Sequence, residues 1–458
     1  MEKTYRRRIA NFVRNIAGAV TLLLSLFPFC ANAISIINDE ETEQYLQAVI
    51  EPIYKAAGLP FNRREIYIVN DMSLNAFVSD GNNMFVFTGT ILAVDNTNEL
   101  SGVLAHETGH IKGGHLVRQK LKMQDLQKFS LASLILAGAA GVASGRGDVA
   151  AAIMLGGNSS AVHNLTAYQV EEERSADEAS VGLLKKIGQS PAGMARFMQK
   201  IKAQNKLQGR VETPYFRTHP ITDERINFLE NAAKQSKLPQ NSPLDKKLAR
   251  IKAKLAGFLL HPEKVRRIYR SDNLGTDAIY ARTIADLQEF KYSQAMQKID
   301  ELLKREPENP HFLELKGQIY LEQGKTKEAR VQFEKALKLL PSSALFKFNL
   351  AQTMLESEHT KADLQYTETV LNQALRDFSS PYGWILLARV YDELNKPAER
   401  GYASAKYSFE IGEMMMAKKQ TAEAKKHNPD AKLLLKLDDL EHQIDAYFDE
   451  NPSLPVRR

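Results

Sequence analysis

Residues 104–115 read Leu-Ala-His-Glu-Thr-Gly-His-Ile-Lys-Gly-Gly-His and contain the pattern H-E-x-x-H at 106–110. On an α-helix, residues i and i+4 lie on the same face, so His106 and His110 can both reach one tetrahedral Zn²⁺. Glu107 would lie beside the metal, where its carboxylate can take a proton from water activated there. The alternative is a chance combination of two histidines and a glutamate. A third ligand decides between these two interpretations.

Candidates for the third ligand lie in an acidic segment further along the chain. Residues 171–173 are three consecutive glutamates, and Asp177 follows Glu173 at i+4. A ligand carboxylate with a second carboxylate one helical turn later suits a zinc site, because ligating histidines usually donate their other N–H to a carboxylate. We therefore predict that Glu173 binds the metal and that Asp177 orients a ligand histidine. A solvated acidic helix is the alternative, and the upstream H-E-x-x-H pattern disfavours it.

Residues 1–33 have the features of a secretory signal peptide: a basic start, a short apolar run over 16–29 and a small-x-small cleavage pattern ending at Ala33. Cleavage there would remove the single cysteine, Cys30, so the mature chain would need no disulfides in an oxidising compartment. Because this segment carries five basic residues and one acidic residue, its loss lowers the net charge from +6 to about +2. Nucleic-acid binding has no support from this charge. An uncleaved membrane anchor is the alternative, although the apolar run is shorter than the roughly 18 residues of a spanning helix.

A small sheet packed on the motif helix is predicted for the N-terminal half. Apolar residues recur at helical spacing over 41–57, and residues 65–69 have the composition of a strand. Residues 75–78 and 84–88 predict a hairpin, and a helix from about residue 98 carries the H-E-x-x-H pattern. We expect the last strand, 84–88, to be placed where an extended peptide can pair with it.

Residues 129–158 are rich in Ala, Gly, Leu and Ile, but Gly145-Arg146-Gly147-Asp148 divides them into two pieces. Each piece is too short to span a bilayer. A pair of helices packing through small residues is the favoured interpretation. A hairpin that touches the membrane or gates the substrate is the alternative.

The C-terminal half shows an internal repeat. Pro307 and Pro341 are separated by 34 residues, as are Ala295 and Ala329, and this is the period of the tetratricopeptide repeat. The residues that match its pattern are Gly317, Tyr320, Gly324, Ala329, Phe333, Ala336 and Pro341, with a further unit at Trp384, Leu387, Ala388 and Tyr391. Such repeats stack helix pairs into a concave surface that binds segments of other proteins. A generic helical bundle is the alternative.

The zinc-binding pattern and its flanking motifs resemble the M48 family of zinc metallopeptidases, which are gluzincins. The resemblance includes H-E-x-x-H at 106–110 and Glu173-x-x-x-Asp177. It extends upstream to Asn75-Ala76-Phe77 and downstream to Thr218-His219-Pro220 with Arg225-Ile226. Gln169-Val170 departs from the Ser-Arg that many members have there. A metzincin is excluded because its third histidine would fall at Leu116, whereas His115 is one residue short.

This resemblance implies an α+β zincin-like (gluzincin) metalloprotease domain followed by an all-α tetratricopeptide-repeat array. His106, His110 and Glu173 would hold one Zn²⁺ per chain, Glu107 would act as the general base, and Asp177 would orient a ligand. His219 could stabilise the oxyanion or serve as an inhibitory fourth ligand, and a structural histidine that fixes the turn is the alternative. For His115 a packing role or a contact with a ligand residue is favoured over ligation.

The predicted domains are a signal peptide (1–33), the protease domain (34–233), a linker with a connecting helix (234–262) and the repeat domain (263–458). The resemblance implies a periplasmic endopeptidase in quality control of outer-membrane β-barrel proteins. Its substrates would be unfolded or stalled outer-membrane proteins. The β-barrel assembly machinery would be a partner through the repeats, and the resemblance also allows a peripheral membrane contact. The competing hypothesis is a non-catalytic chaperone or adaptor with a latent zinc site.

Overall fold

The computed structural model describes residues 35–79, 82–121, 169–208 and 214–450. The predicted signal peptide with its cleavage site after Ala33 and the apolar segment over 129–158 lie outside these residues. In the part of the chain that is described, no helix combines the length and the apolar character that a membrane span requires.

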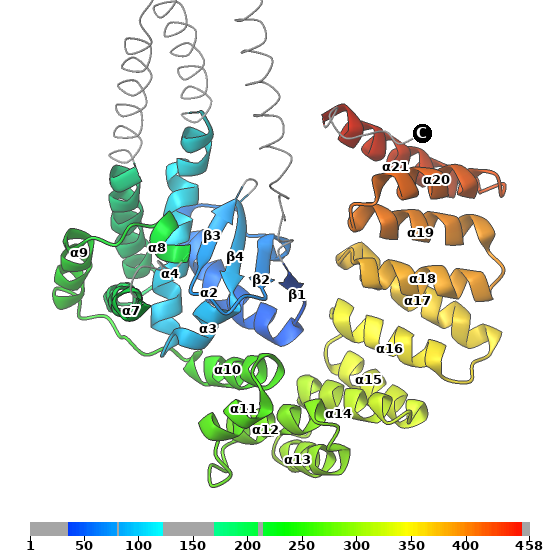
Figure 1. Ribbon diagram of the computed structural model, residues 1–458, viewed down its shortest axis with the longest axis horizontal. Coiled ribbons are helices and arrows are strands. Elements are labelled where there is room, and N and C mark those ends of the chain that lie inside the picture. Colours follow the sequence, from blue (N-terminus) through cyan, green and yellow to red (C-terminus); the bar gives the residue numbers. More distant parts are fainter. Residues whose placement is uncertain (1–34, 80–81, 122–168, 209–213, 451–458) are drawn as a thin grey trace, which may run out of the picture. The chain divides into compact units, whose positions relative to one another are not determined.

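The N-terminal part combines a four-stranded sheet with surrounding helices (Figure 1). Its strands, given in chain order, are β1 (Ile36–Ile37), β2 (Ile66–Val69), β3 (Ala76–Ser79) and β4 (Asn83–Phe87). Its helices are α2 (Glu40–Ala57), α3 (Thr88–Ala93), α4 (Thr97–Gly113), α7 (Ala192–Gln208), α8 (Pro214–Thr218) and α9 (Asp223–Lys234). A further helix covers residues 169–186. The helices and strands predicted for residues 41–113 are therefore all present.

The strand order is β1-β2-β4-β3, so β3 forms one edge of the sheet. β4 pairs in parallel with β2, where Ile66 lies opposite Met84, and antiparallel with β3, where Ala76 lies opposite Val86. Our expectation that the strand over 84–88 can accept an extended peptide is therefore wrong, because both of its sides are paired. The hairpin itself was expected, but the parallel pairing with β2 is a long-range contact that the hairpin pattern does not reveal.

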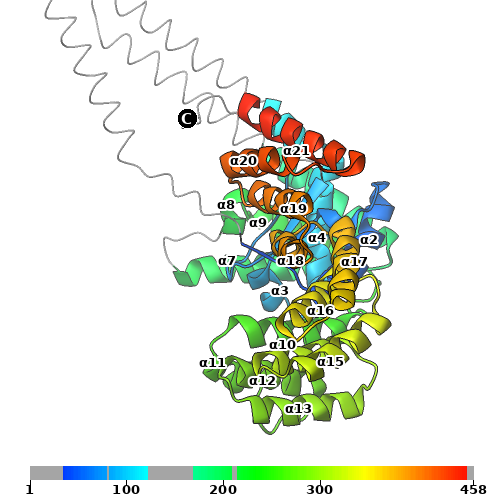
Figure 2. The same cartoon turned by 90° about the vertical axis from the view of Figure 1, so that its right-hand side faces the viewer.

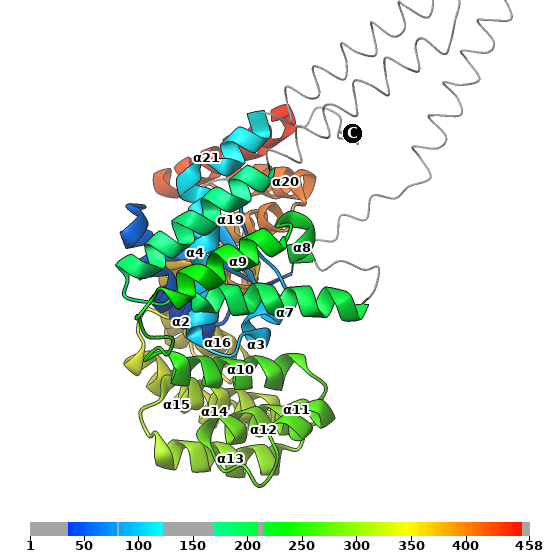
Figure 3. The same cartoon turned by 90° about the vertical axis from the view of Figure 1, so that its left-hand side faces the viewer.

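The sheet has two chemically different faces because successive side chains alternate along each strand. One face carries buried aliphatic residues such as Ile68 and Val86, which share a core with apolar side chains of α2 and α4. On the other face, the half-buried rings of Tyr67 and Phe77 stack on either side of Phe85, at centroid distances of 4.8 and 4.7 Å. The buried face holds α4 against the sheet. Figure 3 shows α7 and α9 beside α4, and α7 packs against both helices.

Helix α10 (Asp245–Leu259) connects the N-terminal part to the helices that follow. Its side chains Leu248, Ile251 and Leu255 belong to the same core as the sheet. Lys254 is buried and forms an ion pair with Asp39, while its Nζ lies 3.4 Å from Oε2 of Glu41. Tyr280 donates a hydrogen bond to that same Glu41 oxygen, over 3.2 Å. A buried charge cluster thus joins α2, α10 and α12.

The rest of the described chain is helical. Its helices are α11 (Pro262–Ile268), α12 (Thr276–Gln288), α13 (Tyr292–Arg305), α14 (Pro310–Glu322), α15 (Thr326–Leu339), α16 (Ala344–Glu356), α17 (Lys361–Asp377), α18 (Pro381–Glu393), α19 (Pro397–Glu410), α20 (Met414–Lys425) and α21 (Ala431–Glu450). Each helix from α12 to α21 packs against the next one in the chain (Figure 2). Gly317 and Phe333 both belong to the tetratricopeptide pattern, and the structure shows why they occur together. The Phe333 ring fills the space where a Cβ at residue 317 would lie. Helix pairs of this kind build a continuous core only by stacking.

Replacing Glu314 with glutamine is expected to flatten the pH dependence of stability. Glu314 is buried on α14, and burial raises the pKa of its carboxyl from 4.5 to about 7. Between these values the folded chain holds a proton that the unfolded chain releases, so wild-type stability falls as the pH rises through this window. The glutamine keeps an oxygen that can accept the hydrogen bond from Asn349. It should therefore gain about 1–3 kcal/mol over wild type at pH 8 and little at pH 4.

Urea denaturation at several pH values measures this difference. Glu308→Gln, at an exposed glutamate just before α14, is the matched control and should follow the wild-type profile. Parallel profiles for wild type and Glu314→Gln would contradict the prediction.

Candidate metal centre

Helix α4 carries the H-E-x-x-H pattern and begins and ends at defined caps. The Asn96 side chain accepts a hydrogen bond from the Glu99 N–H, and Gly114 ends the helix with φ at 65°. His106 and His110 are buried on one face of the helix, and their Nε2 atoms lie 3.1 Å apart. This is the arrangement that the i, i+4 spacing predicts for two ligands of one metal.

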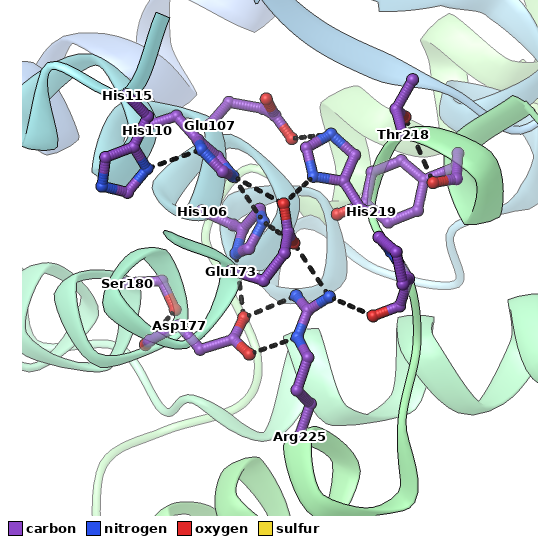
Figure 4. A network of polar contacts seen from close by, with 12 residues as sticks. His106, Glu107, His110, His115, Glu173, Asp177, Ser180, Thr218, His219 and Arg225 are labelled. Atoms are coloured by element: carbon purple, nitrogen blue, oxygen red, sulfur yellow. Dashed lines mark hydrogen bonds and ion pairs between the residues drawn. The ribbon is translucent and has the colours of Figure 1, made fainter. Parts of the chain in front are cut away.

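The helix over residues 169–186 brings the carboxylate to this pair (Figure 4). Glu173 Oε2 lies 3.2 Å from His106 Nε2, and its Oε1 lies 3.3 Å from His110 Nε2. The two helices come close because residue 109 is glycine: a Cβ there would lie 2.9 Å from the Ala176 carbonyl oxygen. The two imidazoles and the carboxylate thus converge.

His219 reaches the same point from the loop after α8. Its Nδ1 lies 2.9 Å from Glu173 Oε1, and its Nε2 lies 3.6 Å from Oε1 of Glu107. The ring of Tyr215 packs against the His219 ring with a centroid distance of 4.6 Å. His106, His110, Glu173 and His219 each offer one ligand atom, and these atoms all lie within 4.8 Å of one another.

Asp177 and Arg225 support this group from below in Figure 4. Asp177 Oδ1 lies 2.9 Å from His106 Nδ1, on the side of the ring away from Glu173. Arg225 donates to both Asp177 oxygens over 2.7 and 3.0 Å, and its Nη1 lies 2.8 Å from Glu173 Oε2. Arg225 also donates to the Pro220 carbonyl oxygen. The sequence includes Arg225 in a motif but gives it no role, because the contact depends on how α9 packs.

Burial and ion pairing shift the protonation of the group in opposite directions. Burial raises the pKa of Glu107. Burial would also raise the pKa of Glu173, but the neighbouring histidines hold it well below its usual value. Burial lowers the pKa of His110 to about 3, whereas the carboxylates of Asp177 and Glu173 outweigh burial at His106 and raise its pKa to about 10. Positive charge is therefore favoured at His106 and disfavoured at His110.

The donor set fits zinc. Two imidazole nitrogens and one carboxylate oxygen are ligands that catalytic zinc sites use. Neither carboxylate oxygen of the buried Glu107 accepts a hydrogen bond from a described residue. A buried carboxylate without such a partner is costly unless something else occupies the space beside it, such as a cation or water. Glu107 thus lies beside the proposed ligands without being one of them.

Comparisons with known proteins agree with this geometry. Residues 40–233 match peptidase family M48, a range that contains α4, the helix over 169–186 and α9 up to its last residue but one. This chain contains a peptidase family M48 domain. Residues 310–343 match the tetratricopeptide repeat, and this range covers α14 and α15. The predicted fold class, an M48 protease domain followed by a helical repeat array, is confirmed, and the chain is a metalloprotease.

Two relatives match more than three quarters of this chain, and a third matches a shorter part of it. It is 26% identical over 370 residues to the Beta-barrel assembly-enhancing protease of Yersinia pestis, covering 77% of this chain and 73% of the relative. The protein of the same name from Escherichia coli (strain K12) is 26% identical over 379 residues, with 79% and 74% covered. Metalloprotease LoiP of Escherichia coli (strain K12) is 28% identical over 174 residues, which are 38% of this chain and 63% of LoiP.

Proposed function

We propose that this chain is a zinc-dependent endopeptidase of the periplasm that acts on outer-membrane β-barrel proteins and uses its repeats for docking. The observation that carries the proposal is the convergence of His106, His110 and Glu173 beside the hydrogen-bond-free carboxylate of Glu107. A purely structural metal site would not need a base at that position. The mature chain is proposed to begin after Ala33.

His106, His110 and Glu173 would hold the metal. Zinc bound there would polarise the scissile carbonyl and lower the pKa of the attacking water. Glu107 takes the proton from that water and passes it to the leaving amine, and its burial keeps it close to the reacting groups. Asp177, whose Oδ1 lies 2.9 Å from His106 Nδ1, would orient that ring so that its Nε2 faces Glu173, where the metal would be held.

His219 has two proposed roles that differ in their consequence. As an oxyanion stabiliser it would speed cleavage, whereas as a fourth ligand it would hold the enzyme latent. Its contacts with both Glu173 and Glu107 put it within reach of either role. The rate of cleavage by His219→Ala distinguishes them: slower cleavage assigns the first role and faster cleavage the second.

Outer-membrane proteins are proposed as substrates because the relatives that match most of the chain are named for β-barrel assembly. An unfolded barrel protein is an extended chain, and β3 offers such a chain an edge strand that packs against α4, the helix that carries His106 and His110. The helical repeats would hold the substrate, or the β-barrel assembly machinery, and so raise the local concentration of cleavable chain.

The test is degradation of an unfolded outer-membrane β-barrel protein by the purified full-length mature chain, with zinc measured in the same samples. The same barrel protein folded in detergent micelles is the control substrate. Cleavage of the unfolded form that stops with a zinc chelator and returns with added zinc supports the proposal. Zinc binding and substrate binding without cleavage would instead support the chaperone or adaptor hypothesis.

A further inference from the structure

His115 lies against a proposed metal ligand, which is one of the two roles that the sequence favours for it, although helical spacing alone does not bring the two rings together. It follows His110 by five residues, and on a continuous helix it would point roughly 140° away from that residue. The helix is interrupted at Gly114, whose φ of 65° is left-handed, and the chain is helical again over 115–121. The ring of His115 is thereby turned back, and its Nδ1 lies 2.8 Å from Nδ1 of His110 (Figure 4).

If His110 binds a metal, only one placement of the protons on the two rings is consistent with this contact. A histidine that binds a metal through Nε2 is neutral and carries its proton on Nδ1. Nε2 of His110 is the atom that faces Glu173 and His106, so its Nδ1–H must be donated elsewhere. The described residue that receives it is His115, which then accepts through Nδ1 and carries its own proton on Nε2.

The two proposed ligand histidines are supported by different groups. His106 has a carboxylate, Asp177, at its outer nitrogen, and that carboxylate is paired with Arg225. His110 has a neutral imidazole instead. His115 is only 3% exposed, so water has little access to the contact.

We propose that His115 is the positioning residue of His110: it accepts the Nδ1–H, fixes the tautomer that leaves Nε2 free for the metal, and holds the ring in place. This inference rests on the proposed zinc site. His115 is not itself a ligand. Its Nε2 is turned to the Gly113 backbone, where a Cβ on residue 113 would lie 2.2 Å away.

One pair of variants separates acceptance of a hydrogen bond from packing. Asparagine can place its Oδ1 close to the position of the histidine Nδ1, whereas leucine fills a similar volume and accepts nothing. His115→Leu should weaken zinc binding by about 10- to 100-fold. The zinc affinity of His115→Asn should stay within about threefold of wild type, because asparagine still accepts the hydrogen bond from His110. Zinc affinity is measured by competition with a chelating dye, and thermal unfolding of the metal-free proteins checks the fold.

A second test displaces His115 without changing any polar side chain. The Cβ of Gly113→Ala would meet ring atoms of His115 at 2.2 and 2.6 Å, so the ring must move. Alanine is a better helix former than glycine, so weaker zinc binding cannot come from a weaker helix. Gly182→Ala is the matched control, because the helical Gly182 has open space around its Cβ position. We expect at least tenfold weaker zinc binding for Gly113→Ala and no change for Gly182→Ala.

Nitrogen-15 NMR of the zinc-loaded chain shows which ring nitrogen of His115 carries the proton. We expect this nitrogen to be Nε2. A proton on Nδ1 of His115, or wild-type zinc affinity in both His115→Leu and Gly113→Ala, would overturn the positioning role and leave the zinc protease intact. A wild-type chain that binds no zinc would overturn the proposed function, and with it this role.

Discussion

Replacing Arg225 with methionine is expected to lower the free energy of unfolding of the metal-free protein by about 3–5 kcal/mol. Arg225 is buried, and its guanidinium lies between the carboxylates of Asp177 and Glu173. Methionine has a similar length but no charge, so both carboxylates lose the guanidinium in a place that water hardly reaches. Removing one partner of such a buried pair is costly because the other charge stays buried.

Chemical denaturation after removal of zinc measures this effect. Arg225→Lys keeps the charge but cannot hold both Asp177 oxygens, so an intermediate loss is expected. Arg174→Met is the matched control, because Arg174 is 62% exposed and its pair with Glu178 is a surface contact. Its effect should be below about 1 kcal/mol. Equal stability of Arg225→Met and wild type would show that the buried network does not hold the site together.

Glu107→Gln is expected to reduce kcat/KM for proteolysis by about 10²- to 10⁴-fold while zinc stays bound. The glutamine has nearly the same shape but cannot accept the proton of the attacking water. Burial raises the pKa of Glu107, which makes its carboxylate a better proton acceptor than an exposed glutamate. Zinc should be retained because Glu107 stands outside the ligand group.

The comparison uses peptide cleavage rates and zinc content from the same preparations. Glu178→Gln, at an exposed glutamate on the helix over 169–186, should cleave at the wild-type rate. Undiminished cleavage by Glu107→Gln would remove the general base from the mechanism.

The sequence predicted those parts of the fold that depend on local patterns. Helix α4, strand β2 and the β3–β4 hairpin follow from periodicity and turn residues within short windows. The position of β4 inside the sheet could not be predicted, because it depends on the pairing of residues 66–69 with residues 84–87. The expectation of a free edge at β4 failed for this reason.

Likewise, the sequence predicted only those parts of the proposed site that depend on local helical spacing. Helical spacing alone brings His106 and His110 together, and helical phase distinguishes Glu173, which faces α4, from the exposed Glu171. Arg225 comes from a separate helix, and its position between two carboxylates needed the packed structure. The return of His115 onto His110 depends on one left-handed glycine, whose φ value no spacing rule provides.

The most direct measurement of the central claim is the zinc content of the purified mature chain and of Glu173→Ala, with cleavage of an unfolded outer-membrane β-barrel protein followed in the same samples. The account predicts one Zn²⁺ per wild-type chain, zinc-dependent cleavage, and loss of both in Glu173→Ala with the fold retained. A wild-type chain without zinc, or a Glu173→Ala variant that binds zinc and cleaves as wild type does, would contradict it.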